Sequence, residues 1–270
     1  MEGILENCST ASLVGAIEAN LCAVWSLFGR VPGTEAHDGP DALWTLTDVP
    51  CALLNAVHRA RLEGPEVDAT IELVISRGRA RGVPLLWLTS PATRPADLAS
   101  FLEAHGFVRG DEMLGMANEL ASLTEEPAPV PGLVVSEPGD EAELHTWCVT
   151  AAAAFEYPPF VGEFFERWLH ALSPAVRSSL ALYLGRLDGE AVASSMLVPG
   201  AGVAGIYCVA TLPAARRRGI GSALTLRALL EGRARGYRVG VLAAEEAGVG
   251  LYRRLGLQEY CKIGCYLWEP

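Results

Sequence analysis

The chain has 270 residues, half of them hydrophobic, and a formal net charge of −11, so it is long enough for two domains with sizeable cores. The first 130 residues carry 8 basic and 18 acidic residues, against 13 and 14 in the remainder, and so acidic a half repels nucleic acid. No uncharged apolar run reaches about 18 residues, which predicts no membrane span, and the acid Glu2 without basic neighbours is unlike a secretory signal.

The seven cysteines are an odd number at scattered positions, and no C-x-x-C pair is present. This usage favours reduced thiols in a cytoplasmic protein and predicts no metal site. The acidic charge of the first half has two interpretations. It keeps the protein soluble, or it steers cationic amine substrates toward the molecule.

Apolar periodicity and turn residues define the elements of the first half. A turn-rich stretch over 29–40 separates its first helix from its first strand, and Gly106 stops its last helix. In chain order we expect a helix over 12–27, strands over 42–47 and 52–57, a helix over 68–82, a strand over 85–89, a helix over 94–105 and a last element over 113–120.

A proline-rich acidic stretch ends this half, and we take residues 125–131 as a linker between domains of residues 1–124 and 132–270. The sequence Leu187-Asp-Gly-Glu190 predicts a hairpin in the second half. There we expect a strand over 133–136, helices over 141–155 and 161–172, strands over 179–186, 191–198 and 206–211, a helix from 223, a strand over 237–243, a helix over 247–255, and strands over 257–260 and 262–268.

The stretch from Ile206 to Leu226 combines a strand, a glycine-bearing loop and a helix start. The first turn of a helix has backbone N–H groups without partners and the positive end of the helix dipole. Glycines let these groups approach a phosphate closely, and we expect the missing Cβ of Gly221 to leave room for phosphate oxygens. The order of residues matches neither a dinucleotide-binding G-x-G-x-x-G nor a P-loop. It predicts an anion site.

The spacing Arg216-x-x-Gly219-x-Gly221 resembles the pyrophosphate loop of the GNAT superfamily of N-acetyltransferases. A second segment, Glu246 to Leu257 (EAGVGLYRRLGL), resembles that family's A-x-x-x-Tyr-x-x-x-Gly-Phe motif, with Leu257 in place of Phe. The element order of residues 132–270 is also similar to that family's. The resemblance implies an α/β (α+β) fold in which each domain is a mixed, mostly antiparallel twisted sheet flanked by helices.

The resemblance implies acetyl-CoA as co-substrate and a primary amine of a small molecule or peptide as acceptor. The expected coenzyme contacts are Val209, Thr211, Arg216, Arg217, Arg218, Gly219, Ile220, Gly221 and Ser222. A backbone N–H near Val209 would polarise the thioester carbonyl, and Tyr252 would return a proton to the leaving thiolate. Glu156 and Glu245 are candidate general bases, with a water relay as the alternative. Glu245, Glu246 and Ala247 stand where family members often place an Asn that contacts the coenzyme.

The first half resembles the same family more faintly and has no Arg-x-x-Gly-x-Gly. We interpret it as a degenerate, non-catalytic copy, and an unrelated α/β domain is the alternative. Two functions stay open for the whole chain: an acetyl-CoA-dependent N-acetyltransferase, or a non-catalytic acyl-CoA-binding regulatory protein. A tandem of two such domains also resembles mycothiol synthase. We expect a monomer or homodimer that binds neither nucleic acid nor membranes.

Overall fold

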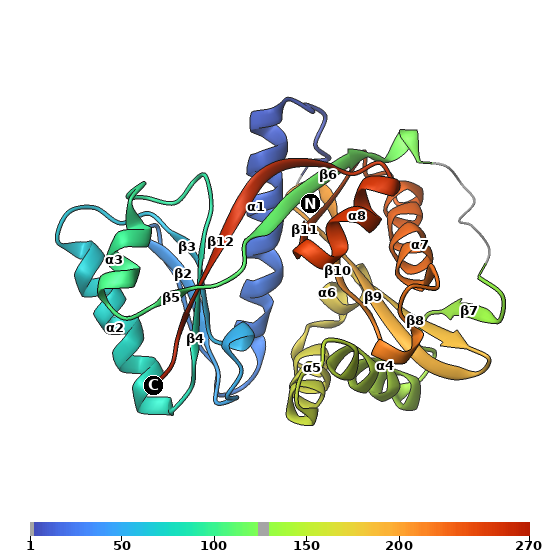
Figure 1. Cartoon of the computed structure of the whole chain (residues 1–270), viewed down its shortest axis with the longest axis horizontal. Helices are drawn as coiled ribbons and strands as arrows, with labels where there is room; N and C mark the ends of the chain where they lie inside the picture. The colour runs from blue at the N-terminus through green and yellow to red at the C-terminus, as the bar shows by residue number, and fades with distance from the viewer. Residues whose placement is uncertain (1–2, 124–129) are drawn as a thin grey trace.

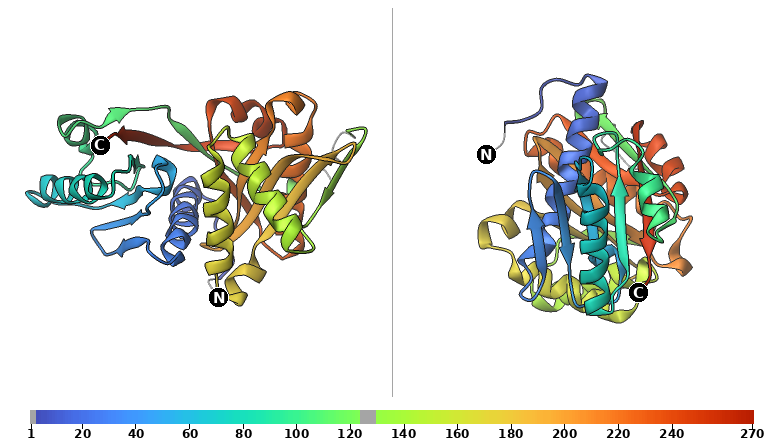
Figure 2. Two further views of the ribbon diagram at one scale, coloured as in Figure 1. Left: turned by 90° about the horizontal axis from the view of Figure 1, so that it is seen from below. Right: turned by 90° about the vertical axis from the view of Figure 1, so that its left-hand side faces the viewer.

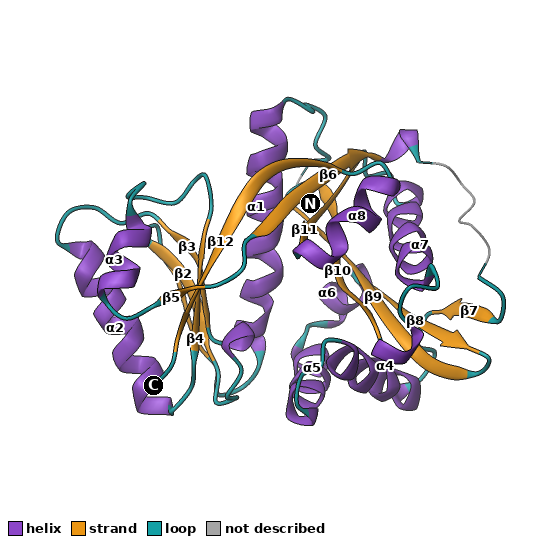
Figure 3. Ribbon diagram, viewed as in Figure 1, coloured by secondary structure: helices purple, strands orange, loops and turns teal. Residues whose placement is uncertain are grey.

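In the computed structural model, which describes residues 3–123 and 130–270, the strands form one continuous sheet of 12 strands (Figure 1). Their order is β1-β2-β3-β4-β12-β6-β11-β10-β9-β8-β7, and β5 pairs with β12 beside this path. Helices flank both ends of the sheet (Figure 3). Within the described residues, the pairs β3/β4 and β10/β11 are parallel and the others antiparallel, which confirms the predicted mixed, mostly antiparallel architecture.

The N-terminal copy, as we call residues 10–123, begins with a long helix and then alternates strands with two further helices. Its last two helices end at glycines in the left-handed conformation, Gly82 (φ 63°) and Gly106 (φ 87°). The elements are α1 (Thr10–Ser26), η1 (Leu27–Arg30), β1 (Glu35–Asp38), β2 (Ala42–Leu46), η2 (Ala52–Leu54), β3 (Ala56–Ala60), α2 (Glu66–Arg81), β4 (Leu85–Thr89), α3 (Leu98–Ala104), β5 (Val108–Arg109), β6 (Met113–Glu119) and η3 (Leu120–Ser122).

The C-terminal copy, residues 130–270, follows the predicted order with one addition, the short helix α6. Large apolar side chains of α4 and α5, including Trp147, Phe164 and Trp168, are buried against one face of its sheet, and α7 covers the other. The elements are β7 (Leu133–Ser136), α4 (Glu141–Ala154), α5 (Pro159–Ala171), α6 (Pro174–Ser179), β8 (Ala181–Leu187), β9 (Glu190–Gly200), β10 (Val203–Thr211), η4 (Pro213–Ala215), α7 (Ile220–Ala234), β11 (Val239–Ala244), α8 (Glu246–Arg254) and β12 (Gln258–Trp268).

The two copies exchange strands. β6 of the N-terminal copy lies between β11 and β12, antiparallel to both. β12 pairs first with β6 and then, from Gly264 to Trp268, with β4 of the N-terminal copy. The prediction of two strands over 257–260 and 262–268 is wrong, because the chain forms one strand with a register shift between Glu259 and Cys261. Each predicted domain therefore contributes a strand to the other's sheet. Of the predicted linker, residues 125–129 lie outside the described residues.

Helix α1 lies between the two copies, where it fills the space between the N-terminal sheet and the helices of the C-terminal copy (Figure 2). One buried cluster joins side chains of α1, β4 and β11 (Leu13, Ile17, Leu21, Leu86, Leu88, Val239 and Val241). By length and a mean hydropathy of 1.5, the helical stretch Thr10–Arg30 could also cross a membrane, and 44% of its apolar window is buried inside the protein. The absence of a membrane span stays a prediction.

Residues 52–57 differ from the strand that the sequence predicts. The chain makes the turn η2 first, and β3 begins at Ala56. The buried Asn55 side chain explains the turn, because its Nδ2 donates to the carbonyls of Val49 and Cys51 while its Oδ1 accepts from the N–H of Thr47. These bonds replace the ladder bonds of a strand. The predicted turn-rich stretch over 29–40 similarly contains the short strand β1.

Candidate active site

The predicted anion site is a helix start without a side-chain cap. Gly219 is the N-cap of α7, and its φ of 85° lies in the left-handed region that favours glycine. No side chain caps the helix, and no hydrogen bond outside it is donated by the backbone of residues 217–222 within the described part of the chain. The N–H groups of Ile220, Gly221 and Ser222 are therefore available to an anion at the positive end of the helix.

The three arginines before this helix differ in their contacts. The Arg216 guanidinium donates to the carbonyls of Thr211 and Ala154, at 3.0 Å each, and pairs with Glu156 at 2.8 Å. It thus places a cation at the C-terminal end of α4 and ties the loop to that helix. Arg217 and Arg218 are exposed, and neither has an ion pair among the residues that the structure describes.

The structure gives Gly221 a neighbour that the sequence did not show. A Cβ at this position would lie 3.0 Å from Leu251 Cδ1, so the missing side chain makes room for α8, and the predicted contact with a phosphate stays a prediction. The hydroxyl of Thr211 lies near the same point, 3.9 Å from that Cβ position. Gly221 therefore brings the start of α7, the end of β10 and α8 together, and its N–H still belongs to the first helical turn.

β10 and β11 diverge immediately before this loop. Their parallel pairing is confined to Ala204–Gly240 and Gly205–Val241, and we call the point where they separate the C-terminal fork. β10 also carries a bulge against β9 after Tyr207, where Cys208 has a φ of 51°. The bulge turns the strand and places Val209 in the stretch that has left β11. The Ser194 hydroxyl holds this geometry by donating to the Cys208 carbonyl at 2.8 Å.

Tyr252 of α8 is only 8% exposed and packs in the same buried cluster against which Val209 lies. Its ring lies over the first turn of its helix, where a Cβ at Gly248 would be only 2.8 Å from Tyr252 Cε2. Burial raises the pKa of the Tyr252 hydroxyl, and the negative charge of Glu245 raises it further. The hydroxyl is protonated at neutral pH, as in a free tyrosine, and has a proton to donate, but the raised pKa makes it a weaker acid than a free tyrosine.

Glu245 is the exposed N-cap residue of α8, and its charge acts on two tyrosines, Tyr252 of the same helix and Tyr157 between α4 and α5. It raises the pKa of Tyr252, and it contributes to the raised pKa of Tyr157, for which burial is the main cause. Glu245 is thus a carboxylate near the fork without an ion pair among the described residues. Glu156, the other predicted base, has a carboxylate oxygen engaged by Arg216.

A residue that sequence reasoning missed connects the N-terminal copy to the fork. Asn20 of α1 is fully buried, donates to the carbonyls of Val198 and Gly200 of β9, and accepts from the Tyr207 hydroxyl at 2.7 Å. A Cβ at Gly205 would lie 2.0 Å from Asn20 Oδ1, so this glycine allows the close approach. A polar residue among the inward positions of an apolar helix is the signal that could have identified it.

The family comparison agrees with this geometry. Residues 132–257 match the model of the Acetyltransferase (GNAT) family. The C-terminal copy is a GNAT acetyltransferase domain, and acyl-CoA-dependent acetyl transfer is the general chemistry of that family. No curated protein matches the sequence.

Solved structures extend the likeness to the whole chain. A GCN5-related N-acetyltransferase from Kribbella flavida has a TM-score of 0.67 at 20% identity, over 93% of this chain and 95% of that one. A tandem GNAT protein from the clavulanic acid biosynthesis pathway has a TM-score of 0.59 at 15% identity, over 99% and 96%. A GCN5-related N-acetyltransferase from Sphaerobacter thermophilus has a TM-score of 0.60 at 18% identity, over 86% and 82%. These likenesses support the interpretation of the first half as a second, degenerate GNAT-like copy.

Proposed function

We propose that the protein is an acetyl-CoA-dependent N-acetyltransferase that acetylates a primary amine of a small molecule or peptide. The observation that carries this proposal is the start of α7 at the end of a strand that has left its neighbour. This helix start has no side-chain cap, and Arg217 and Arg218 beside it have no ion pair among the described residues. Such a helix start binds phosphate groups, and a strand with a free edge can pair with an extended chain. Acetyl-CoA contains both a diphosphate and an extended arm.

In this proposal each residue of the fork has a defined task. The N–H groups of residues 218–222 and the guanidinium groups of Arg217 and Arg218 hold the diphosphate. The bound coenzyme supplies an acetyl thioester. The backbone N–H of Val209 donates to the thioester carbonyl oxygen, where one such donor lowers a barrier by about 3 kcal/mol. Tyr252, held protonated by burial and by Glu245, donates its proton to the leaving sulfur.

Glu245 is the better candidate for the amine side of the reaction. Its carboxylate has no ion pair among the residues described, whereas that of Glu156 pairs with Arg216. An exposed carboxylate at the fork attracts a cationic amine and can accept its proton. We expect Glu245→Gln to lower kcat/KM for amines about tenfold or more and to leave the affinity for acetyl-CoA unchanged. Glu246→Gln, at the exposed neighbouring position, is the matched control and should retain full activity.

The test combines calorimetry of acetyl-CoA with thiol release in the presence of polyamines, aminoglycosides and amino acids. The enzyme proposal requires both saturable coenzyme binding and amine-dependent thiol release. Binding without turnover on any amine would favour the alternative, a non-catalytic acyl-CoA-binding protein. Absence of coenzyme binding would contradict the assignment of the α7 loop.

A further inference from the structure

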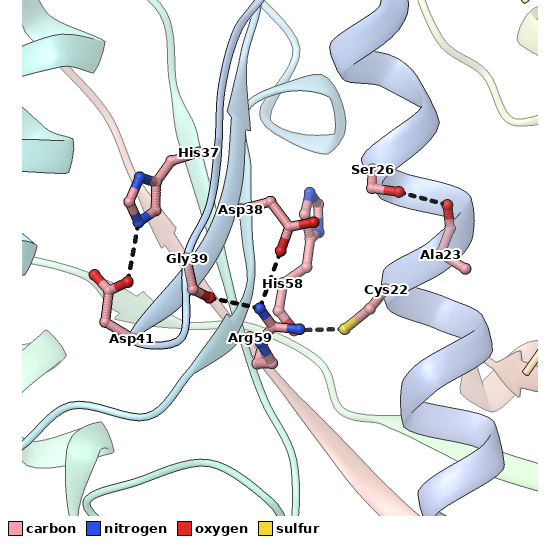
Figure 4. Close-up of polar contacts among 9 residues, drawn as sticks. All are labelled: Cys22, Ala23, Ser26, His37, Asp38, Gly39, Asp41, His58 and Arg59. Atoms are coloured by element: carbon pink, nitrogen blue, oxygen red, sulfur yellow. Dashed lines mark hydrogen bonds and ion pairs between the residues drawn. The ribbon is translucent and has the colours of Figure 1, made fainter.

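A pocket of about 440 Å³ lies in the N-terminal copy, between α1 and the sheet formed by β1 to β4. This volume is within the range of small-molecule sites. Small side chains of α1, such as Ala19 and Ala23, leave the space open. Figure 4 shows how side chains of the strands approach α1 across it, with the His58 ring in the gap between β3 and the helix. The pocket is separate from the fork between β10 and β11.

Two charged groups on the pocket wall are paired with each other, and two are not. The Arg59 guanidinium bonds the Asp38 carboxylate at 3.1 Å and the Gly39 carbonyl at 2.7 Å (Figure 4). Arg61 and Glu18 also line the pocket, and neither has an ion pair within the described part of the chain. The Glu18 carboxylate is held in place because its Oε1 accepts from the N–H of Ala92 at 2.9 Å. One cation and one carboxylate are thus left for a ligand.

His58 adds an unsatisfied polar atom to the same wall. The residue is 5% exposed, and its Nε2 lies 3.2 Å from the Thr45 hydroxyl, but its Nδ1 has no hydrogen-bond partner among the described residues. Its ring stacks on Trp25 of α1. Burial lowers the pKa of His58 to about 3, so the imidazole is neutral and adds no charge. A buried nitrogen without a partner is uncommon in folded proteins, and a ligand is one of the groups that can satisfy it.

The four charged groups all lie near the Cys22 thiol. Arg59, Glu18, Arg61 and Asp38 all act on the pKa of the Cys22 thiol, which burial raises to about 11. Cys22 therefore stays a neutral thiol, with its Sγ 3.6 Å from the His58 carbonyl, and the pocket has no reactive thiolate. The charges that surround the thiol are balanced, which disfavours a multiply charged anion and favours a ligand with both signs.

From this arrangement we propose that the pocket binds a small zwitterion, an α-amino acid, with its ammonium group on Glu18 and its carboxylate on Arg61. Both contacts are charge-assisted, and Arg can bind a carboxylate through two parallel hydrogen bonds. The side chain of the ligand lies against the small apolar residues of α1. Because α1 also carries Asn20, which bonds β9 and Tyr207, an occupied pocket contacts the helix that reaches the fork. The proposal concerns binding and does not depend on the proposed catalytic function.

The experiment measures binding of single L-α-amino acids to the full chain by calorimetry and thermal shift. The amino acid that binds best is then compared with its methyl ester, which lacks the carboxylate, and its N-acetyl derivative, which lacks the ammonium. We expect saturable binding of the free amino acid, and at least about tenfold weaker binding of both derivatives, because each loses a charge-assisted contact.

The variants Glu18→Gln and Arg61→Gln locate the ligand. Gln at position 18 retains a carbonyl oxygen for the Ala92 N–H, so the local structure is kept while the charge is lost. Each variant should weaken amino-acid binding about tenfold or more, while acetyl-CoA binding stays unchanged. Arg30→Gln and Glu72→Gln, at exposed positions without an ion pair among the described residues, are the matched controls and should bind as the wild type does.

Two results would overturn the proposal. One is that no amino acid binds saturably at millimolar concentrations to the wild-type chain. The other is that an amino acid binds but with the same affinity in Glu18→Gln and Arg61→Gln, which would place the ligand elsewhere, for example at the fork as an acceptor. Either result leaves the coenzyme measurements valid, so failure here is distinct from failure of the acetyltransferase proposal.

Discussion

The two copies contain forks built on the same backbone plan. β3 and β4 pair in parallel only over 56–57 and 86–87, as β10 and β11 do over 204–205 and 240–241, and we call this point the N-terminal fork. In each copy a bulge in the first strand follows the fork, at His58 in β3 and at Cys208 in β10. The difference lies in the stretch beyond the bulge. In the N-terminal copy, the backbone of Arg94 occupies the edge of β3 beyond the bulge. Its N–H donates to the Ala60 carbonyl, and its carbonyl accepts from the Leu62 N–H.

The helix starts beside the forks differ in charge and in free donors. α2 has Pro65 as its N-cap where α7 has Gly219, and its first turn carries the acids Glu66 and Asp68. Its first N–H groups are already used, because Glu66 and Val67 donate to carbonyls of the preceding turn. Such a start repels a phosphate, whereas that of α7 attracts one.

The third difference is that the N-terminal copy has no hydroxyl group at the position that corresponds to Tyr252. Helices α3 and α8 end with the same hydrogen bonds, from Phe107 N to Leu102 O at 3.0 Å and from Leu257 N to Tyr252 O at 3.1 Å. Leu102 therefore stands at the position of Tyr252 and is fully buried in the apolar core. The three differences agree with our proposal that only the C-terminal copy holds and processes a coenzyme.

The largest expected effect comes from making the C-terminal fork like the N-terminal one at position 252. Tyr252→Phe removes the hydroxyl and keeps the ring over Gly248, so we expect kcat to fall about a hundredfold while acetyl-CoA affinity is retained. Because the Tyr252 pKa is raised, the wild-type rate should show no loss from this group between neutral pH and its ordinary pKa of about 10. Steady-state kinetics of thiol release over pH checks both points. An unchanged kcat would exclude the acid role.

The next effect tests whether one fork or both bind the coenzyme. Replacing both Arg217 and Arg218 by Ala removes two exposed cations beside the α7 start, and we expect acetyl-CoA affinity to fall about thirtyfold. Calorimetry of the wild type should give one site per chain. Arg30→Ala is the control for the loss of an exposed positive charge. A second site that survives in the double variant would show that the N-terminal fork also binds, and the contrast between the two helix starts would then not decide coenzyme binding.

A smaller effect, on stability, tests how firmly the N-terminal copy supports the C-terminal fork. Asn20→Ala leaves two carbonyls and the Tyr207 hydroxyl without their partner, and we expect the free energy of unfolding to fall by about 2 kcal/mol. Tyr207→Phe removes only one of these bonds and should cost about 1 kcal/mol. Urea unfolding of both variants gives the difference. Equal values for the two would mean that the bonds to β9 contribute nothing.

The smallest effect concerns the ion pair that distinguishes Arg216 from its neighbours. Glu156→Gln breaks a pair whose side chains are 45% and 62% exposed, so we expect a loss of stability below about 1 kcal/mol and nearly unchanged kcat. Chemical denaturation and thiol release measure the two quantities. A fall in kcat of tenfold or more would instead identify Glu156 as the general base, and the role that we give to Glu245 would be wrong.

Local signals in the sequence were sufficient for the described α-helices other than the short α6, and for the fold of the C-terminal copy. Glycine stops at Gly82, Gly106 and Gly256 and the apolar periodicity predicted α2, α3 and α8 with small errors at their ends. The resemblance of two short motifs to one family identified the C-terminal copy, because loop, strand and helix there follow a pattern that few other sites share.

Long-range pairing could not be predicted in the same way. A strand pattern reports which residues face the core but not which strand lies beside it, so the exchange of β6 and β12 was missed. Side-chain partners were missed for the same reason, such as the carbonyls bonded by Arg216 and the neighbour that Gly221 accommodates. The site residues of the fork stay predictions until a coenzyme complex or the proposed variants test them.

The strand exchange has a consequence for synthesis on the ribosome. The segment 264–268 that flanks β4 is translated after all of the C-terminal copy's other strands and helices. The N-terminal copy therefore leaves the ribosome with the β4 edge of its sheet unpaired. It can complete that sheet only after residues 264–268 have been translated. We therefore expect the two copies to complete their folding together, after the last strand is translated, rather than one after the other.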